Sequence, residues 1–155
     1  FRWRNKDNVR KNFLDQRPFT VESHTSWLEN VVYTGRAAQF IIYEKEGDFP
    51  VGSVFLRDID YQNKKAEFGI FIGEDSARGK GIGTEAAKSI VKYGFTELKL
   101  HKIFLRVLAD NKGAIKSYGK AGFVQEAYLK DDVLLNGEYR DIILMALFNP
   151  ERSAE

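Results

Sequence analysis

The chain has 155 residues, of which 43% are hydrophobic and 30% are charged, a composition that predicts one compact α/β domain with its own core. The formal net charge is only +2 and basic residues are interspersed with acidic ones, so we expect no nucleic-acid partner. The absence of cysteine excludes disulfides, cysteine-ligated zinc and a cysteine acyl-enzyme.

Metal-dependent and membrane-bound proteins are also disfavoured. The two histidines, His24 and His101, lie far apart and form no H-E-x-x-H pattern, so we expect no catalytic metal. No apolar run approaches the roughly 20 residues of a membrane span, and no signal-peptide pattern is present. We therefore expect a cytoplasmic protein without a membrane partner.

Two helices are expected before the first strand. Residues 1–14 place apolar side chains among charged ones, which predicts a helix with one internal break. A second helix is expected to begin at Ser23 or Ser26, since Glu29 follows Ser26 by three positions as in a capping box. Gly35 is typical of its end.

After this helix the apolar residues recur with the period typical of strands. This pattern predicts a three-stranded meander over residues 37–44, 51–57 and 66–72. A long helix follows, because apolar residues recur three and four positions apart from Ala86 to Leu98.

The second half of the chain starts with residues 102–108, whose almost continuous apolar run is typical of a strand inside a sheet. Asn111 is predicted to cap the next helix, and Gly122 to follow its end.

Two last strands, 123–129 and 138–147, are predicted to pair through the turn Asn136-Gly137. Residues 149–155 are polar and are expected to form a loose tail. No repeat or linker interrupts the chain, so we predict a single domain over residues 1–155.

A glycine-rich segment, Arg78-Gly79-Lys80-Gly81-Ile82-Gly83, lies between the third strand and the long helix. Its alternating glycines would let backbone N–H groups approach an anion, and the helix N-terminus would add its dipole. The spacing fits neither a Walker A loop nor the dinucleotide fingerprint G-x-G-x-x-G, in which Thr84 would have to be glycine. A tight strand-to-helix turn without a ligand is the alternative.

The pattern R-x-x-G-x-G in this segment resembles the acyl-CoA loop of the GNAT N-acetyltransferases, where backbone amides hold the pyrophosphate of acetyl-CoA. A second segment, N-x-x-A-I-x-x-Y-x-K-x-G-F from Asn111 to Phe123, is similar to another conserved segment of that family. The resemblance implies an α/β GNAT fold: a mixed, mostly antiparallel sheet with a central parallel pair and helices on both faces.

The resemblance also implies an acetyl-CoA site. Its expected cosubstrate-binding residues are Phe71, Ile72, Arg78, Gly79, Lys80, Gly81, Ile82, Gly83, Thr84, Asn111, Ser117 and Lys120. Phe71 and Ile72 would offer backbone groups to pantetheine and the thioester oxygen. Asn111 and Ser117 would lie near the pantetheine arm or the sulfur, although Asn111 is also explained as a plain helix cap.

Two catalytic roles follow from the same resemblance. Tyr118 matches the family tyrosine that protonates the departing thiolate, the alternative being an aromatic residue packed under the sheet. Glu67, the only acid in residues 66–72, matches a carboxylate that many relatives use as base, directly or through a water. A structural glutamate remains equally open, and His24 is a second candidate base.

The acceptor is predicted from looser matches. The W-R-N opening, the H-x-x-W-L element and the Y-x-D-I-I-x-M ending are similar to the subgroup of ribosomal-protein, diamine and nucleotide-aminosugar acetyltransferases. They look most like the enzyme that acetylates a UDP-linked 4-amino-4,6-dideoxy sugar in pseudaminic acid biosynthesis. The residues expected to contact this acceptor are Trp3, Arg4, His24 and Trp27.

Without a cysteine or a G-x-S-x-G elbow, direct attack of the amine on the thioester in a ternary complex is the simplest mechanism. A protein N-terminal amine, a polyamine and a non-catalytic acyl-CoA-binding domain remain alternatives, and a homodimer is left open. The family's usual first strand is missing ahead of Phe1, and the absence of an initial Met leads us to expect a trimmed chain.

Overall fold

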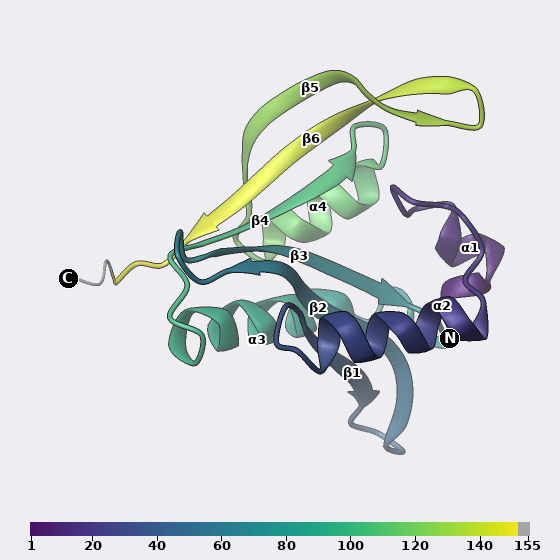
Figure 1. Cartoon of the computed structure of the whole chain (residues 1–155), viewed down its shortest axis with the longest axis horizontal. Helices are drawn as coiled ribbons and strands as arrows, with labels where there is room; N and C mark the ends of the chain where they lie inside the picture. The colour runs from purple at the N-terminus through teal and green to yellow at the C-terminus, as the bar shows by residue number, and fades with distance from the viewer. Residues whose placement is uncertain (152–155) are drawn as a thin grey trace.

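The computed structural model describes residues 1–151 and contains one six-stranded mixed sheet with helices on both faces (Figure 1). The strands lie in the order β1-β2-β3-β4-β6-β5. Their bounds are β1 Ala38–Glu44, β2 Phe49–Asp60, β3 Lys65–Ile72, β4 Lys102–Leu108, β5 Val124–Leu135 and β6 Glu138–Phe148. Only β3 and β4 pair in parallel. The predicted mostly antiparallel sheet with a central parallel pair is therefore confirmed.

The longer helices follow the two predicted motifs: α3 spans Ile82–Thr96 and α4 spans Lys112–Lys120. The N-terminal helices are shorter than expected. A 3-10 turn at Trp3–Asn5 precedes α1 at Asp7–Arg10, and α2 at Val21–Trp27 continues as a π turn over Leu28–Val32. A further 3-10 turn, Asp75–Ala77, follows β3.

The start of the second helix differs from the prediction. Thr20 Oγ1 accepts a hydrogen bond from the Ser23 N–H at 3.1 Å, and Ser23 Oγ accepts one from the Thr20 N–H at 3.0 Å. This reciprocal capping box makes Thr20 the cap and Ser23 its partner. Both expected caps are wrong, because Ser23 is the third residue of α2 and Ser26 lies further inside it, where its hydroxyl accepts from Asn30.

The two faces of the sheet have separate cores. On one face, Leu56, Phe68, Ile103 and Leu105 pack against α3 and α4. On the other face, side chains of β2 and β3 pack against the N-terminal segment, in a cluster formed by Phe55 and Phe71 with Trp3, Val9 and Phe13. Side-chain direction alternates along β2, β3 and β4, so that neighbouring residues in each strand pack into opposite layers.

The parallel pair is joined only briefly. β3 and β4 pair at Lys65–Lys102, Ala66–Ile103 and Glu67–Phe104, and no further pair follows within the described residues. Figure 1 shows the two strands diverging toward the side where α1 and α2 lie. The divergence opens the middle of the sheet at the carboxyl ends of two parallel strands, which is where open α/β sheets bind ligands.

The start of the expected loose tail is held in place. The Asn149 N–H donates to the His101 carbonyl at 2.8 Å, and the Asn149 side chain donates to the Leu100 carbonyl at 3.1 Å. The rest of that tail, residues 152–155, lies outside the described residues. Across residues 1–151, no helix has the length and apolarity that a membrane crossing requires.

Candidate active site

The glycine-rich loop adopts a backbone conformation that requires glycine. Gly79 and Gly81 have φ angles of +75° and +76°, in the left-handed region that other residues rarely adopt. A Cβ at either position would meet nothing within 4 Å. Glycine is therefore needed at these two positions for its positive φ angle, and not because a neighbouring side chain packs closely against it.

The same loop presents a row of unpaired donors. Within residues 1–151, the backbone N–H groups from Gly79 to Thr84 donate to no turn, cap or side-chain acceptor, and the next one, of Glu85, bonds to the Gly81 carbonyl. Six consecutive N–H groups thus lie at the N-terminus of a 15-residue helix. That arrangement is suited to a phosphate or pyrophosphate group.

A cavity of about 740 Å³ extends from this loop into the opening between β3 and β4. It brings together all but one of the predicted cosubstrate-binding residues: Phe71, Ile72, Arg78, Gly79, Gly81, Ile82, Gly83, Thr84, Asn111, Ser117 and Lys120. The exception is Lys80, whose Nζ lies 2.9 Å from Glu44 Oε1 beside β1. Its side chain points away from the cavity.

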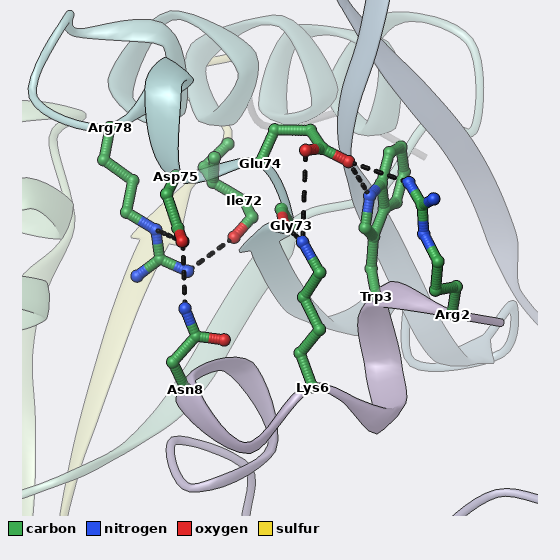
Figure 2. Close-up of polar contacts among 9 residues, drawn as sticks. All are labelled: Arg2, Trp3, Lys6, Asn8, Ile72, Gly73, Glu74, Asp75 and Arg78. Carbon is green, nitrogen blue, oxygen red and sulfur yellow. Dashed lines mark hydrogen bonds and ion pairs between the residues drawn. The ribbon is translucent and has the colours of Figure 1, made fainter.

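Arg78 closes the strand side of the loop. Its Nη2 donates to the Ile72 carbonyl at 2.9 Å, and its Nε lies 3.5 Å from Asp75 Oδ1 (Figure 2). The Ile72 carbonyl, which was expected to meet pantetheine, is therefore already engaged. Asn8 of α1 donates to the same Asp75 oxygen at 2.9 Å.

The helix side of the cavity is set by α4. Asn111 Oδ1 accepts from the Ala114 N–H at 3.3 Å, which confirms the predicted cap. Ser117 Oγ lies 3.4 Å from Thr84 Oγ1 of α3. This contact brings the two helices together beside the loop.

Tyr118 lies where this cavity meets a second one. The second cavity, of about 520 Å³, is on the N-terminal face of the sheet, and both cavities are lined by Phe13, Ile70, Arg106 and Tyr118. The rings of Phe68 and Phe123 pack edge-on against Tyr118. Burial raises the pKa of Tyr118 to about 12. Its hydroxyl thus keeps its proton at neutral pH and can donate it.

The second cavity contains two of the four residues predicted to contact the acceptor. Arg4 and Trp27 line it, together with Phe13, Phe19 and Phe55. Trp3 and His24 do not. Trp3 packs against Gly73 and donates from Nε1 to Glu74 Oε1 at 2.5 Å (Figure 2).

His24 lies behind the cavity wall, with its ring 5.5 Å from that of Trp27. Its Nδ1 is buried and has no partner in the described part of the chain. Burial lowers the pKa of His24, and nearby positive charges, Arg4 among them, lower it further. The imidazole is therefore held in its neutral form near pH 7.

Glu67 is buried between two arginines, with 3% of its surface exposed. Arg106 donates to it at 2.9 and 3.2 Å, and Arg57 lies 3.1 and 3.2 Å from its two oxygens. Burial alone would raise the pKa of Glu67, but the hydrogen bonds from Arg106 and Arg57 outweigh it and hold the pKa below its usual value. Glu67 lines neither cavity. Its predicted role as base stays a prediction, and its geometry favours a structural role.

Arg57 and Arg106 were not predicted as site residues. Both interrupt apolar strand sequences, VGSVFLR and KIFLRVL, and a cation in such a strand indicates a buried partner. Each also lines the second cavity. Among residues 1–151, no group of three or more His, Asp or Glu side chains is placed to hold a metal ion.

The comparison with family models matches residues 1–124 to the acetyltransferase (GNAT) domain. The spermidine N(1)-acetyltransferase of Escherichia coli K12 is 40% identical over 114 residues, which are 74% of this chain and 60% of that protein. The acetyltransferase PseH of Campylobacter jejuni is 27% identical over 126 residues, or 79% of this chain and 73% of that protein. The chain thus spans about 60% of the length of the E. coli relative.

Solved structures show the same arrangement. The spermidine N-acetyltransferase of Vibrio cholerae, in complex with CoA and spermine, superposes with a TM-score of 0.87 at 26% identity. The superposition covers 96% of this chain and 86% of the other.

Proposed function

The chain belongs to the GNAT acetyltransferase family, and from this premise we propose that it transfers the acetyl group of acetyl-CoA to a small-molecule primary amine. The observation that carries the proposal is the junction of two cavities at Tyr118. One cavity begins at six unpaired backbone N–H groups, and the other is lined by aromatic side chains and arginines.

In this proposal the N–H groups of residues 79–84 bind the pyrophosphate of acetyl-CoA. Bound acetyl-CoA supplies a thioester, which an amine can attack directly because the sulfur leaves as a thiolate. Phe71, Asn111 and Ser117 line the course from the loop to Tyr118 and would contact the pantetheine arm. The cavity volume of about 740 Å³ and the placement of the unpaired N–H groups at one end of its lining support acetyl-CoA as the cosubstrate.

Tyr118 would donate the proton that the departing thiolate takes up. The hydroxyl is protonated over the whole neutral range, as a general acid must be, although the raised pKa also makes it a weaker acid than an exposed tyrosine. A non-catalytic acyl-CoA-binding domain would have no need of a buried tyrosine at the junction of two cavities. The residues that line both cavities, including Ile70 and Arg106, would hold the amine and the thioester close together.

The names of the relatives suggest which amines to test. The E. coli relative is a spermidine acetyltransferase, and the V. cholerae structure contains spermine, so these relatives favour a polyamine over the expected nucleotide-linked aminosugar. The weaker match to PseH keeps the aminosugar as the second candidate. A dodecameric structure is known for the V. cholerae enzyme, and self-association of this chain is a further proposal, which light scattering can check.

The test is the release of CoA from acetyl-CoA in the presence of an amine panel of polyamines, nucleotide-linked aminosugars and N-terminal peptides. We expect amine-dependent release of CoA and a rise in Tm with CoA. Stabilisation by ATP but not by CoA or acetyl-CoA would contradict the proposal.

A further inference from the structure

The second cavity has an excess of positive charge. Its ionisable lining consists of four arginines and one acid, Arg4, Arg17, Arg57, Arg106 and Asp15, apart from Tyr118. Asp15 is bound by Arg17, with contacts of 2.9 and 2.6 Å from Nε and Nη2 to its two oxygens. These two charges cancel each other, so they leave the other three arginines to determine the potential of the cavity.

Arg57 and Arg106 share one carboxylate. Glu67 receives hydrogen bonds from both, so the three side chains together carry one net positive charge. Both oxygens of Glu67 face these arginines, and the residue does not reach the cavity surface. Glu67 is therefore unavailable to an incoming ammonium group.

Arg4 has no acid partner. Its guanidinium lies over the rings of Phe19, Trp27, Phe71 and Phe13 at 4.6, 5.0, 5.8 and 5.9 Å. Within residues 1–151 it makes no hydrogen bond or ion pair, and its Nε is buried without an acceptor. Aromatic faces hold a cation in place without neutralising it. Arg4 is thus positioned, charged and able to donate.

A second observation agrees with this electrostatic account. The pKa of Arg4 is lowered, first by burial and then by the positive charge of Arg57. The two arginines therefore repel each other across the same cavity, and an anion between them would relieve the repulsion.

We propose, on the basis of the acetyltransferase function proposed above, that the acceptor is an amine that also carries an anionic group, a carboxylate or a phosphate. Arg4 binds this group, with Arg57 beside it. The charge of this cavity therefore argues against the polyamines that the names of the relatives suggest, because each additional ammonium group would meet a net charge of about two positive units and, among the described lining residues, no unpaired carboxylate.

The test uses four amines of one chain length that differ in the charge at the far end: butylamine, 1,4-diaminobutane, 4-aminobutanoate and 4-aminobutyl phosphate. We expect the better anionic substrate, the one of the two with the higher kcat/KM, to exceed 1,4-diaminobutane in kcat/KM by about tenfold or more. This is the effect of one charged hydrogen bond. The comparison of 4-aminobutanoate with 4-aminobutyl phosphate shows which anionic group the site prefers. A higher kcat/KM for 1,4-diaminobutane or spermidine than for both anionic amines would overturn the proposal.

Arg4→Gln identifies the residue responsible. We expect it to lower kcat/KM for the anionic amines much more than for butylamine, so that most of the anionic preference is lost. Arg36→Gln is the matched control, because Arg36 is exposed and lines neither cavity. If Arg4→Gln does not fold, the wild-type series still decides between the two charge preferences.

Failure of the underlying function gives a different result. If none of the amines is acetylated, the acetyltransferase proposal fails, and the anion site is then judged by calorimetric binding to the CoA-saturated wild-type protein. Tighter binding of 4-aminobutanoate or 4-aminobutyl phosphate than of 1,4-diaminobutane supports the anion site, and the reverse order refutes it.

Discussion

At the residue scale, Tyr118 is the side chain at which an effect on catalysis can best be distinguished from an effect on CoA binding. The residue lines both cavities, and burial raises its pKa to about 12. The motif N-x-x-A-I-x-x-Y fixes its position relative to the cap of α4, and its role in the site stays a prediction.

Tyr118→Phe is expected to lower kcat by about a hundredfold, the lower end of general-acid contributions. The affinity for CoA should change little, because the ring and its packing against Phe68 and Phe123 remain. Steady-state kinetics and calorimetry with CoA measure the two effects, with Tyr33→Phe, at an exposed tyrosine, as control. Equal losses of rate and CoA affinity would contradict an acid role.

Glu67→Gln is expected to reduce the free energy of unfolding by about 3 kcal/mol at pH 7, because it leaves two arginines without their carboxylate. The pKa of Glu67 in the folded state is below its ordinary value of 4.5. Its ionised form therefore stabilises the protein above pH 4.5, and this contribution is lost as the pH falls through the lower folded pKa.

The difference between wild type and Glu67→Gln should consequently shrink below pH 4.5, as measured by urea unfolding over a pH series. A base role predicts a different outcome, a large loss of kcat with little change in the free energy of unfolding at pH 7.

At the scale of elements, the glycine loop and α3 form the unit whose backbone N–H groups we propose as the pyrophosphate site. Gly81 precedes the first turn of α3 with φ +76°. Its surroundings are open, so the effect of a substitution comes from the backbone and not from a clash.

Gly81→Ala is expected to weaken CoA binding by about tenfold, since a side chain at this φ costs about 1–2 kcal/mol and reorients the N–H groups. The control is Gly119→Ala within α4, where φ is not positive and a Cβ meets nothing within 4 Å. That change should leave CoA affinity unchanged and stabilise the helix slightly. Calorimetry on both variants checks the difference, and equal CoA affinities would show that the loop conformation is not used.

The sequence predicted the helices and strands better than it predicted the contacts between them. Alternation and turn residues located all six strands, and Asn111 marked the start of α4, because these signals are local. The cap of α2 was missed because Thr20, Ser23 and Ser26 all have capping side chains and only the fold selects among them. The grouping of Arg57 and Arg106 on Glu67 depends on strand order, which no local pattern encodes.

At the scale of the whole molecule, the N-terminal segment joins the second cavity to the residues just before the glycine loop. Trp3 bonds to Glu74, Lys6 Nζ donates to the Gly73 carbonyl at 2.6 Å, and Asn8 bonds to Asp75 (Figure 2). If the second cavity binds the acceptor as proposed, these contacts connect the acceptor site with the pyrophosphate site.

Trp3→Ala is expected to reduce the free energy of unfolding by about 2 kcal/mol, because a half-buried indole that covers Gly73 is lost. It should also weaken CoA binding through the loop. Arg2→Ala is the matched control, since Arg2 contacts the same Glu74 but its side chain is 80% exposed, and such pairs contribute little. Urea unfolding and CoA calorimetry on both variants test the coupling, and similar small effects would refute it.

The three-pair junction of β3 and β4 has a mechanical consequence. The sheet consists of two halves, β1-β2-β3 and β4-β6-β5. Within residues 1–151, backbone hydrogen bonds connect them at the three pairs that begin the parallel ladder and at Lys64 just before it, whose carbonyl accepts from the His101 and Lys102 N–H groups. A ligand bound in the opening between β3 and β4 would contact both halves and link them noncovalently. The resistance of the sheet to bending would then depend on the bound ligand, because contacts with the ligand would replace the backbone hydrogen bonds that β3 and β4 do not form there.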